Sequence, residues 1–211
     1  MRVRITFSKQ GALRYTGHLD LHKLWERAAR RAGLPLSYSQ GFHPQPKISL
    51  AAALPLGFSS RGEVVDIRLN EEIPLQEISN RLKDNLPSGI QICKIESVDE
   101  GKPALQTQVL SALYGVRFTD PVDESDLSNR IDQFLKSTSI MRERRGKSYD
   151  LRPLVEMLSV IGDDYGKVML QMKLAAREGA TGRPDDVLSA LEIKPESTQI
   201  ERTGLIFSSN T

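Results

Sequence analysis

The sequence is poor in cysteine, with Cys93 alone among 211 residues. A single thiol cannot form a disulfide within the chain, hold an iron–sulfur cluster alone or build a cysteine-rich zinc site. No apolar run approaches the roughly 18 residues of a membrane-spanning helix, and the charged first residues lack the apolar stretch of a signal peptide. The net charge of the whole chain is also small, at +2. We therefore expect a cytoplasmic protein with no membrane partner, whose surface as a whole does not attract nucleic acid.

Several motifs of catalytic and cofactor-binding proteins are also missing. The sequence contains no Walker motif, no dinucleotide-binding fingerprint and no nucleophile elbow. From these absences we expect neither a cofactor nor a bound metal.

The spacing of apolar residues predicts an α+β protein made of two tandem ferredoxin-like domains, at 1–100 and 109–211. The elements expected in the first domain are a strand at 2–7, a helix at 18–32, strands at 48–54 and 63–69, a helix at 74–86 and a strand at 90–98. This β-α-β-β-α-β order is that of the ferredoxin-like sandwich, in which two helices cover an antiparallel sheet. Cys93 falls in the last strand, and we expect it to be buried.

A similar order of elements recurs after a linker at 101–108. The elements expected there are a strand at 109–118, a helix at 124–136, strands at 154–161 and 167–175 around a turn at Gly162, Asp163 and Asp164, a short helix at 185–191 and a strand at 199–207. An extra segment at 140–152 is rich in cations and predicts a short basic hairpin. Its cations are Arg142, Arg144, Arg145, Lys147 and Arg152.

Positive charge is concentrated in the first fifty residues, which carry a net charge of +7. In the helix at 18–32, one face is an apolar stripe that should pack on the sheet: Leu21, Leu24, Trp25, Ala28 and Ala32. The opposite face carries four cations within an arc of roughly 100°: Lys23, Arg27, Arg30 and Arg31. This face is either an ordinary solvated surface or a ridge that contacts phosphates, because Asp20 and Glu26 cannot neutralise all four. Cations of adjacent elements could extend it: Arg2, Arg4, Lys9, Arg14 and Lys47.

All three histidines also lie in this part of the chain. His18, His22 and His43 could together hold a metal, although no His-Glu-x-x-His motif is present. Alternatively, His18 or His43 could act as a general base with Tyr15 or a lysine as its partner, driving attack of an RNA 2′-hydroxyl on the adjacent phosphate. The simplest alternative is that these side chains only cap or pack.

The segment at 39–47 has two prolines at alternate positions, which disfavour a helix and a central strand. It is either a binding loop that presents His43 and Lys47, or a stiff connection that leads into an edge strand.

Several short motifs between residues 7 and 46 resemble those of the radical-SAM-linked protein family, a bacterial family of unknown function. The resemblance is carried by Phe7-Ser8-Lys9, Leu13-Arg14-Tyr15, His18-Leu19-Asp20-Leu21, Glu26-Arg27-Ala28, Arg30-Arg31-Ala32-Gly33-Leu34-Pro35 and Tyr38-Ser39-Gln40-Gly41-Phe42, with Pro44 and Pro46. The family motif residues among them are His18, Asp20, Gln40, Gly41 and Phe42. Segments 149–153 and 182–188 are also similar to the family.

The resemblance implies a partner rather than a reaction. Members of the family are encoded beside, or fused to, an uncharacterised radical SAM protein, and this chain has no Cys-x-x-x-Cys-x-x-Cys motif of its own. Together with the basic helix at 18–32, this favours a non-catalytic accessory protein that binds RNA, such as tRNA or rRNA, and presents it to the radical SAM partner. The RNA-binding residues are then Arg14, Lys23, Arg27, Arg30, Arg31 and Lys47.

Two alternatives to this role remain. One is a metal-independent endoribonuclease, because tandem ferredoxin-like domains with an early histidine resemble the enzymes that process CRISPR repeats. Those enzymes have a glycine-rich loop before the last strand, and residues 192–199 contain no glycine. The other is a pure protein–protein adaptor, in which the basic helix meets an acidic partner.

Overall fold

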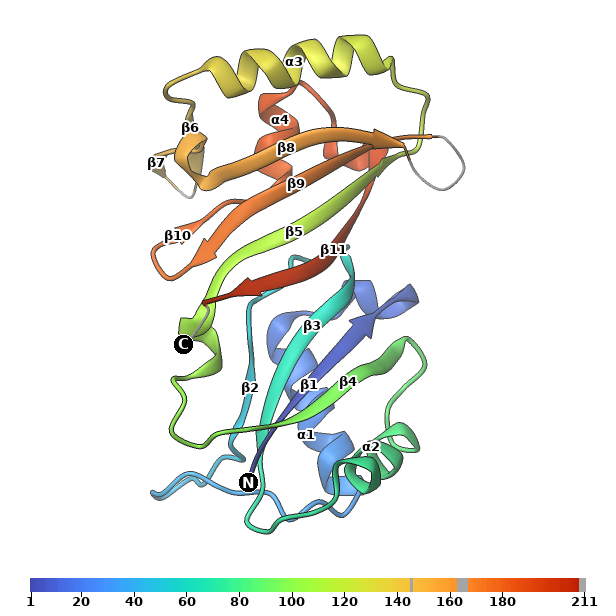
Figure 1. Ribbon diagram of the computed structural model, residues 1–211, viewed down its shortest axis with the longest axis vertical. Coiled ribbons are helices and arrows are strands. Elements are labelled where there is room, and N and C mark those ends of the chain that lie inside the picture. Colours follow the sequence, from blue (N-terminus) through green and yellow to red (C-terminus); the bar gives the residue numbers. More distant parts are fainter. Residues whose placement is uncertain (145, 163–166, 209–211) are drawn as a thin grey trace. The chain divides into compact units, whose positions relative to one another are not determined.

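A computed structural model describes residues 1–144, 146–162 and 167–208. Arg145 and the predicted turn residues Asp163 and Asp164 lie outside the described residues. The chain divides into two compact units, Met1–Val109 and Leu110–Thr211. Both combine helices with sheet, so the predicted α+β class is confirmed (Figure 1). Within the described residues, no helix has both the length and the apolar character needed to span a bilayer.

In the first unit, two helices pack on one face of a four-stranded antiparallel sheet. Its elements are β1 (Arg2–Lys9), the 3-10 helix η1 (Gly11–Tyr15), α1 (His18–Arg31), β2 (Ile48–Leu50), β3 (Ser59–Arg68), α2 (Leu75–Lys83), β4 (Ile90–Val98) and the 3-10 helix η2 (Leu105–Gln108). The strands lie in the order β2-β3-β1-β4, and each adjacent pair is antiparallel. Alternate residues of β1 share one hydrophobic core with both helices, so α1 and α2 cover the same face (Figure 1).

Helix α1 docks through the apolar stripe that its sequence predicts. Leu21, Trp25 and Ala28 are buried, and Trp25 meets the ring of Phe7 edge-on at 4.8 Å between centroids. The helix ends in a Schellman motif, in which Leu34 N–H donates to Ala29 C=O at 3.1 Å and Gly33 N–H to Arg30 C=O. Gly33 has a φ of +63°, which glycine adopts without a Cβ penalty. Because the apolar stripe packs on the sheet, the opposite face of α1 is exposed to solvent.

The other face of β1 carries a buried ionic cluster. Asp66 of β3, only 4% exposed, accepts hydrogen bonds from Arg2 Nε and Arg4 Nε, both at 2.8 Å. Arg2 also donates to the carbonyls of Lys102 and Pro103. Both guanidinium groups are therefore used inside the unit, and Arg2 holds the segment after β4 against the sheet.

Cys93 is exposed, so the predicted burial of its side chain is wrong. The pairing of β1 with β4 shifts at this point: Thr6 faces Lys94, while Phe7 faces Ile92. Cys93 is therefore the extra residue of a β-bulge, which breaks the alternation that the strand pattern assumes.

The second unit has a sheet in the order β8-β9-β5-β11, with β10 paired to the end of β9. Its elements are β5 (Val109–Phe118), α3 (Glu124–Lys136), β6 (Met141–Arg144), β7 (Lys147–Asp150), the 3-10 helix η3 (Arg152–Leu154), β8 (Val155–Gly162), β9 (Val168–Arg177), β10 (Ala180–Thr181), α4 (Pro184–Ala190), the 3-10 helix η4 (Pro195–Ser197) and β11 (Thr198–Phe207). Helix α3 buries Leu127, Ile131 and Phe134, which lie at helical spacing. Strands β6 and β7 pair separately within the segment predicted as a basic hairpin.

Candidate functional site

The exposed face of α1 carries the four predicted cations, which we name the basic ridge: Lys23, Arg27, Arg30 and Arg31. Arg30 pairs with Glu26 at 2.8 Å, and Arg31 donates to the carbonyl of Asn85 at 3.0 Å. Lys23 and Arg27 form no side-chain ion pair or hydrogen bond with the part of the chain that the structure describes. The ridge therefore presents two cations that a ligand can engage without breaking an internal contact.

The cations expected to extend this ridge divide into two groups. Lys47 is exposed, and the half-buried guanidinium of Arg14 lies 4.8 Å from the ring of Tyr15. Arg2, Arg4 and Lys9 use their charged groups inside the unit, so the expectation that they extend the basic ridge is wrong. The first two bind Asp66, and Lys9 is fully buried with its Nζ donating to the Thr16 carbonyl at 3.0 Å.

The segment at 39–47 is a closed, protruding loop. The N–H of Ser39 donates to the Gln45 carbonyl at 2.8 Å, and Gln45 N–H donates to Ser39 Oγ at 2.9 Å. The tip between them exposes Gln40, Gly41, Phe42 and His43, and Phe42 is fully exposed. The base of the loop adjoins the ridge, because the guanidinium of Arg30 lies 5.9 Å from the ring centroid of Tyr38. Cations beside an exposed aromatic ring are the usual elements of a single-stranded RNA surface.

The predicted acid–base residues lie on three different elements of the first unit. Tyr15 ends η1, His18 begins α1 and His43 is at the loop tip. Among the described residues, none of these three forms a hydrogen bond with another of the three. His22 instead lies with its Nε2 3.0 Å from the Ile48 carbonyl. No group of three or more His, Cys, Asp or Glu residues within the described ranges could hold a metal ion.

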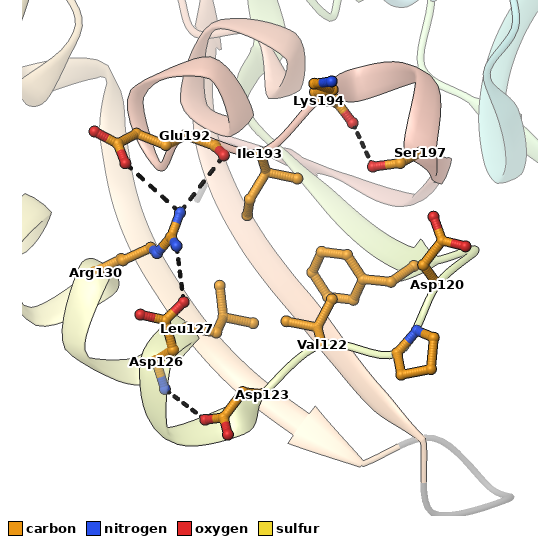
Figure 2. Close-up of a pocket in the computed structure, with 12 residues that line it drawn as sticks. Asp120, Val122, Asp123, Asp126, Leu127, Arg130, Glu192, Ile193, Lys194 and Ser197 are labelled. Atoms are coloured by element: carbon orange, nitrogen blue, oxygen red, sulfur yellow. Dashed lines mark hydrogen bonds and ion pairs between the residues drawn. The ribbon is translucent and has the colours of Figure 1, made fainter.

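The second unit contains an open pocket of about 410 Å³. It lies between the start of α3 and the connection from α4 to β11 (Figure 2). Its apolar floor is formed by Phe118, Val122, Leu127 and Ile193. Its charged lining residues are Asp120, Asp123, Asp126, Arg130, Glu192 and Lys194.

Arg130 fixes one side of the pocket. Its Nη2 lies 2.8 Å from Asp126, and its Nη1 lies 3.8 Å from the Glu192 carboxylate (Figure 2). Nη1 also donates to the carbonyl of Leu191 at 3.2 Å. Asp123 is the N-cap of α3 and accepts the N–H of Asp126 at 2.8 Å. The rim is thus built from two helix ends joined by one guanidinium.

The comparison with protein families decides which family the chain belongs to. The model of an uncharacterized family conserved in bacteria, DUF2344, matches residues 2–184. This chain is a DUF2344 protein. Both the basic ridge and the α3 side of the pocket lie within the matched residues. The predicted membership of a bacterial family of unknown function is confirmed. The predicted link of this family to a radical SAM protein remains a proposal.

Solved structures add a likeness of fold. A chain in the crystal structure of a Cbf5-Nop10-Gar1 complex matches 96% of this DUF2344 protein with a TM-score of 0.51 and 10% sequence identity, and the match spans 48% of that chain. The DUF2344 protein thus corresponds to about half the length of its structural neighbour. A putative glycine cleavage system transcriptional repressor also matches, at 12% identity over 98% of both chains, but with a TM-score of only 0.25. No curated protein matches the sequence significantly.

The fold of this DUF2344 protein brings together the two family-like segments of the second unit. Tyr149 of β7 donates its hydroxyl proton to Asp186 of α4 at 2.6 Å. Burial and this carboxylate raise the pKa of Tyr149 to about 12, and burial beside Asp186 raises the pKa of Asp185. Asp150 accepts the N–H groups of Ile140 and Arg152, and the first of these bonds contributes most to its lowered pKa. The β6–β7 hairpin is thereby fastened to α4.

Sequence reasoning did not find the pocket. Its lining comes from residues 118–130 and 192–197, which are far apart along the chain and share no motif. The one local signal was Asp123 before the apolar stripe of α3, which marks a helix N-cap and nothing more.

Glu192 offers a stability test of the pocket rim. Helix α4 ends in the same Schellman motif as α1, with Ile193 N–H donating to Leu188 C=O at 2.9 Å. Glu192 occupies the position that Gly33 fills in α1, and its φ of 57° is the one positive φ at a non-glycine among the described residues. Glu192→Gly should therefore raise the free energy of unfolding by about 1 kcal/mol, measured by urea denaturation.

The matched control is Gly33→Ala. A Cβ there would meet no atom within 4 Å, so only the φ of +63° opposes it. This change should lower the free energy of unfolding by about 1 kcal/mol. A Glu192→Gly variant that is less stable than the wild type would show that the Arg130–Glu192 contact outweighs the strain.

Proposed function

We propose that this protein is a non-catalytic accessory protein that binds RNA, such as tRNA or rRNA, and presents it to a radical SAM enzyme. The observation that carries the RNA-binding part is the basic ridge, on which Lys23 and Arg27 make no internal ion pair with described residues. Arg30 links the ridge to the base of a loop whose tip exposes Phe42. Cations that contact phosphates, together with a ring on which a base can stack, suit single-stranded or looped RNA.

We further propose that each unit is a ferredoxin-like domain. Each unit has four main strands, which can be counted in the order in which they occur along the chain. In both sheets the second strand lies at one edge, followed by the third, the first and the fourth: β2-β3-β1-β4 and β8-β9-β5-β11. This order and the two helices on one face of the first sheet support the assignment. Sheets of this kind serve as RNA platforms in other proteins.

The test is RNA binding by the whole chain at two salt concentrations, with an unmodified tRNA transcript as the probe. The double variant Lys23→Glu/Arg27→Glu should bind about 10- to 100-fold more weakly, and the slope of log K against log salt should fall by about 2. Lys83→Glu/Lys136→Glu is the matched control, because it reverses two exposed cations outside the ridge. This control should bind within about threefold of the wild type, since it changes only the overall charge.

Equal loss of affinity in both double variants would contradict a role for the ridge. The same gels are read for cleavage: RNA fragments that disappear in His18→Ala or His43→Ala would instead support the endoribonuclease. Binding that requires a co-expressed radical SAM protein encoded beside this chain would support the adaptor.

A further inference from the structure

The pocket of the second unit has the composition of a recognition site for an apolar group. Phe118, Val122, Leu127 and Ile193 form its floor, and Figure 2 shows the labelled apolar side chains directed into one shared space. Its volume of about 410 Å³ lies in the range of binding pockets, roughly 300 to 1,000 Å³.

The mouth of the pocket is open. Its lining residues Asp120, Pro121, Asp123 and Asp126 are all exposed to solvent. A small molecule in a typical site is about 70–90% buried, which this open mouth does not provide. A side chain that projects from a docked polypeptide needs less enclosure, because the rest of that polypeptide covers the rim.

The charge of the rim determines which polypeptide fits. Four carboxylates line the pocket, against the cations Arg130 and Lys194. The guanidinium of Arg130 is occupied by Asp126, Glu192 and the carbonyl of Leu191. Asp120 forms no ion pair with any described residue, and Asp123 uses one carboxylate oxygen, Oδ1, to cap α3. Carboxylate oxygens therefore remain free around an apolar floor.

We propose that this pocket docks an extended segment of a partner protein in which an apolar residue is flanked by lysine or arginine. The apolar side chain occupies the floor, and the flanking cations pair with Asp120 and Asp123. The inference rests on the second unit alone, so it stands or falls independently of RNA binding by the basic ridge.

The test follows the methyl groups of Val122, Leu127 and Ile193 by NMR in the full chain. The probe is a blocked nine-residue peptide with one leucine flanked by lysines. It should shift these three sets of methyl signals in a saturable way. Three comparison probes should leave the methyl signals unshifted: the same peptide with serine for leucine, the same peptide with glutamates for lysines, and spermidine.

The variant that tests the charges is Asp120→Asn/Asp123→Asn. Asparagine is as good an N-cap as aspartate, so α3 should stay capped while both charges are lost. Peptide affinity should fall about three- to tenfold. Asp132→Asn/Glu178→Gln removes two exposed carboxylates that do not line the pocket, and it should bind as the wild type does.

Absence of methyl shifts at millimolar peptide would overturn the proposal. Equal shifts with spermidine would also overturn it, because the pocket would then bind small amines and not a protein segment. Equal loss of affinity in the two double variants would show that the pairing with Asp120 and Asp123 is wrong.

Discussion

Asp66→Ala is expected to lower the free energy of unfolding by about 3 to 5 kcal/mol, because it removes the carboxylate that pairs with the buried guanidinium of Arg2. Arg2 is 2% exposed, and its Nη2 lies 2.6 Å from Asp66. Arg4 binds the same carboxylate through Nε and Nη2. Without Asp66, the buried guanidinium of Arg2 loses a carboxylate that water cannot replace.

Urea denaturation of the whole chain measures this effect. Glu77→Ala is the control, because it breaks an exposed ion pair with Arg81 on α2 and should cost no more than about 0.5 kcal/mol. Asp66→Asn keeps the shape of the side chain and should fall between the two. An Asp66→Ala variant as stable as Glu77→Ala would show that the cluster is solvated in solution.

Trp25→Ala is expected to lower the free energy of unfolding by about 3 to 5 kcal/mol through the cavity that it leaves. Trp25 is fully buried and is the largest side chain that α1 places on the sheet, edge-on to Phe7. The basic ridge is the reverse face of this helix, so the contact that stabilises the unit also positions the proposed RNA surface.

Trp25→Phe separates these two roles. The indole Nε1 is buried without a hydrogen-bond partner in the described part of the chain, so its removal relieves an unsatisfied donor. Trp25→Phe should therefore cost less than about 1.5 kcal/mol and leave RNA affinity unchanged. A phenylalanine variant as unstable as the alanine variant would mean that the indole makes a contact that the ring of phenylalanine cannot.

The sequence was most informative where structure depends on nearby residues. The apolar stripe of α1 predicted a helix at 18–32, and the structure has it at His18–Arg31. This signal is local, since it depends only on helical spacing.

Predictions failed where a distant residue determines the outcome. Arg2 and Arg4 were assigned to a surface patch, because nothing near them in the sequence shows that Asp66 lies across the strand pair. The predicted burial of Cys93 was wrong because β4 contains one inserted residue, which changes the side of the sheet on which the Cys93 side chain lies. The pocket depends on residues about 70 positions apart, so no local pattern could reveal it.

The bulge at Cys93 also has a practical consequence. The chain has one thiol, which is exposed and lies outside the regular pairing of β1 with β4. A maleimide fluorophore should therefore attach at one known position in the unaltered protein, with one dye per chain and little disturbance of the core. The same exposure allows two chains to join through an intermolecular disulfide under oxidising conditions. Reductant, or the dye itself, keeps the chains separate in each binding experiment described above.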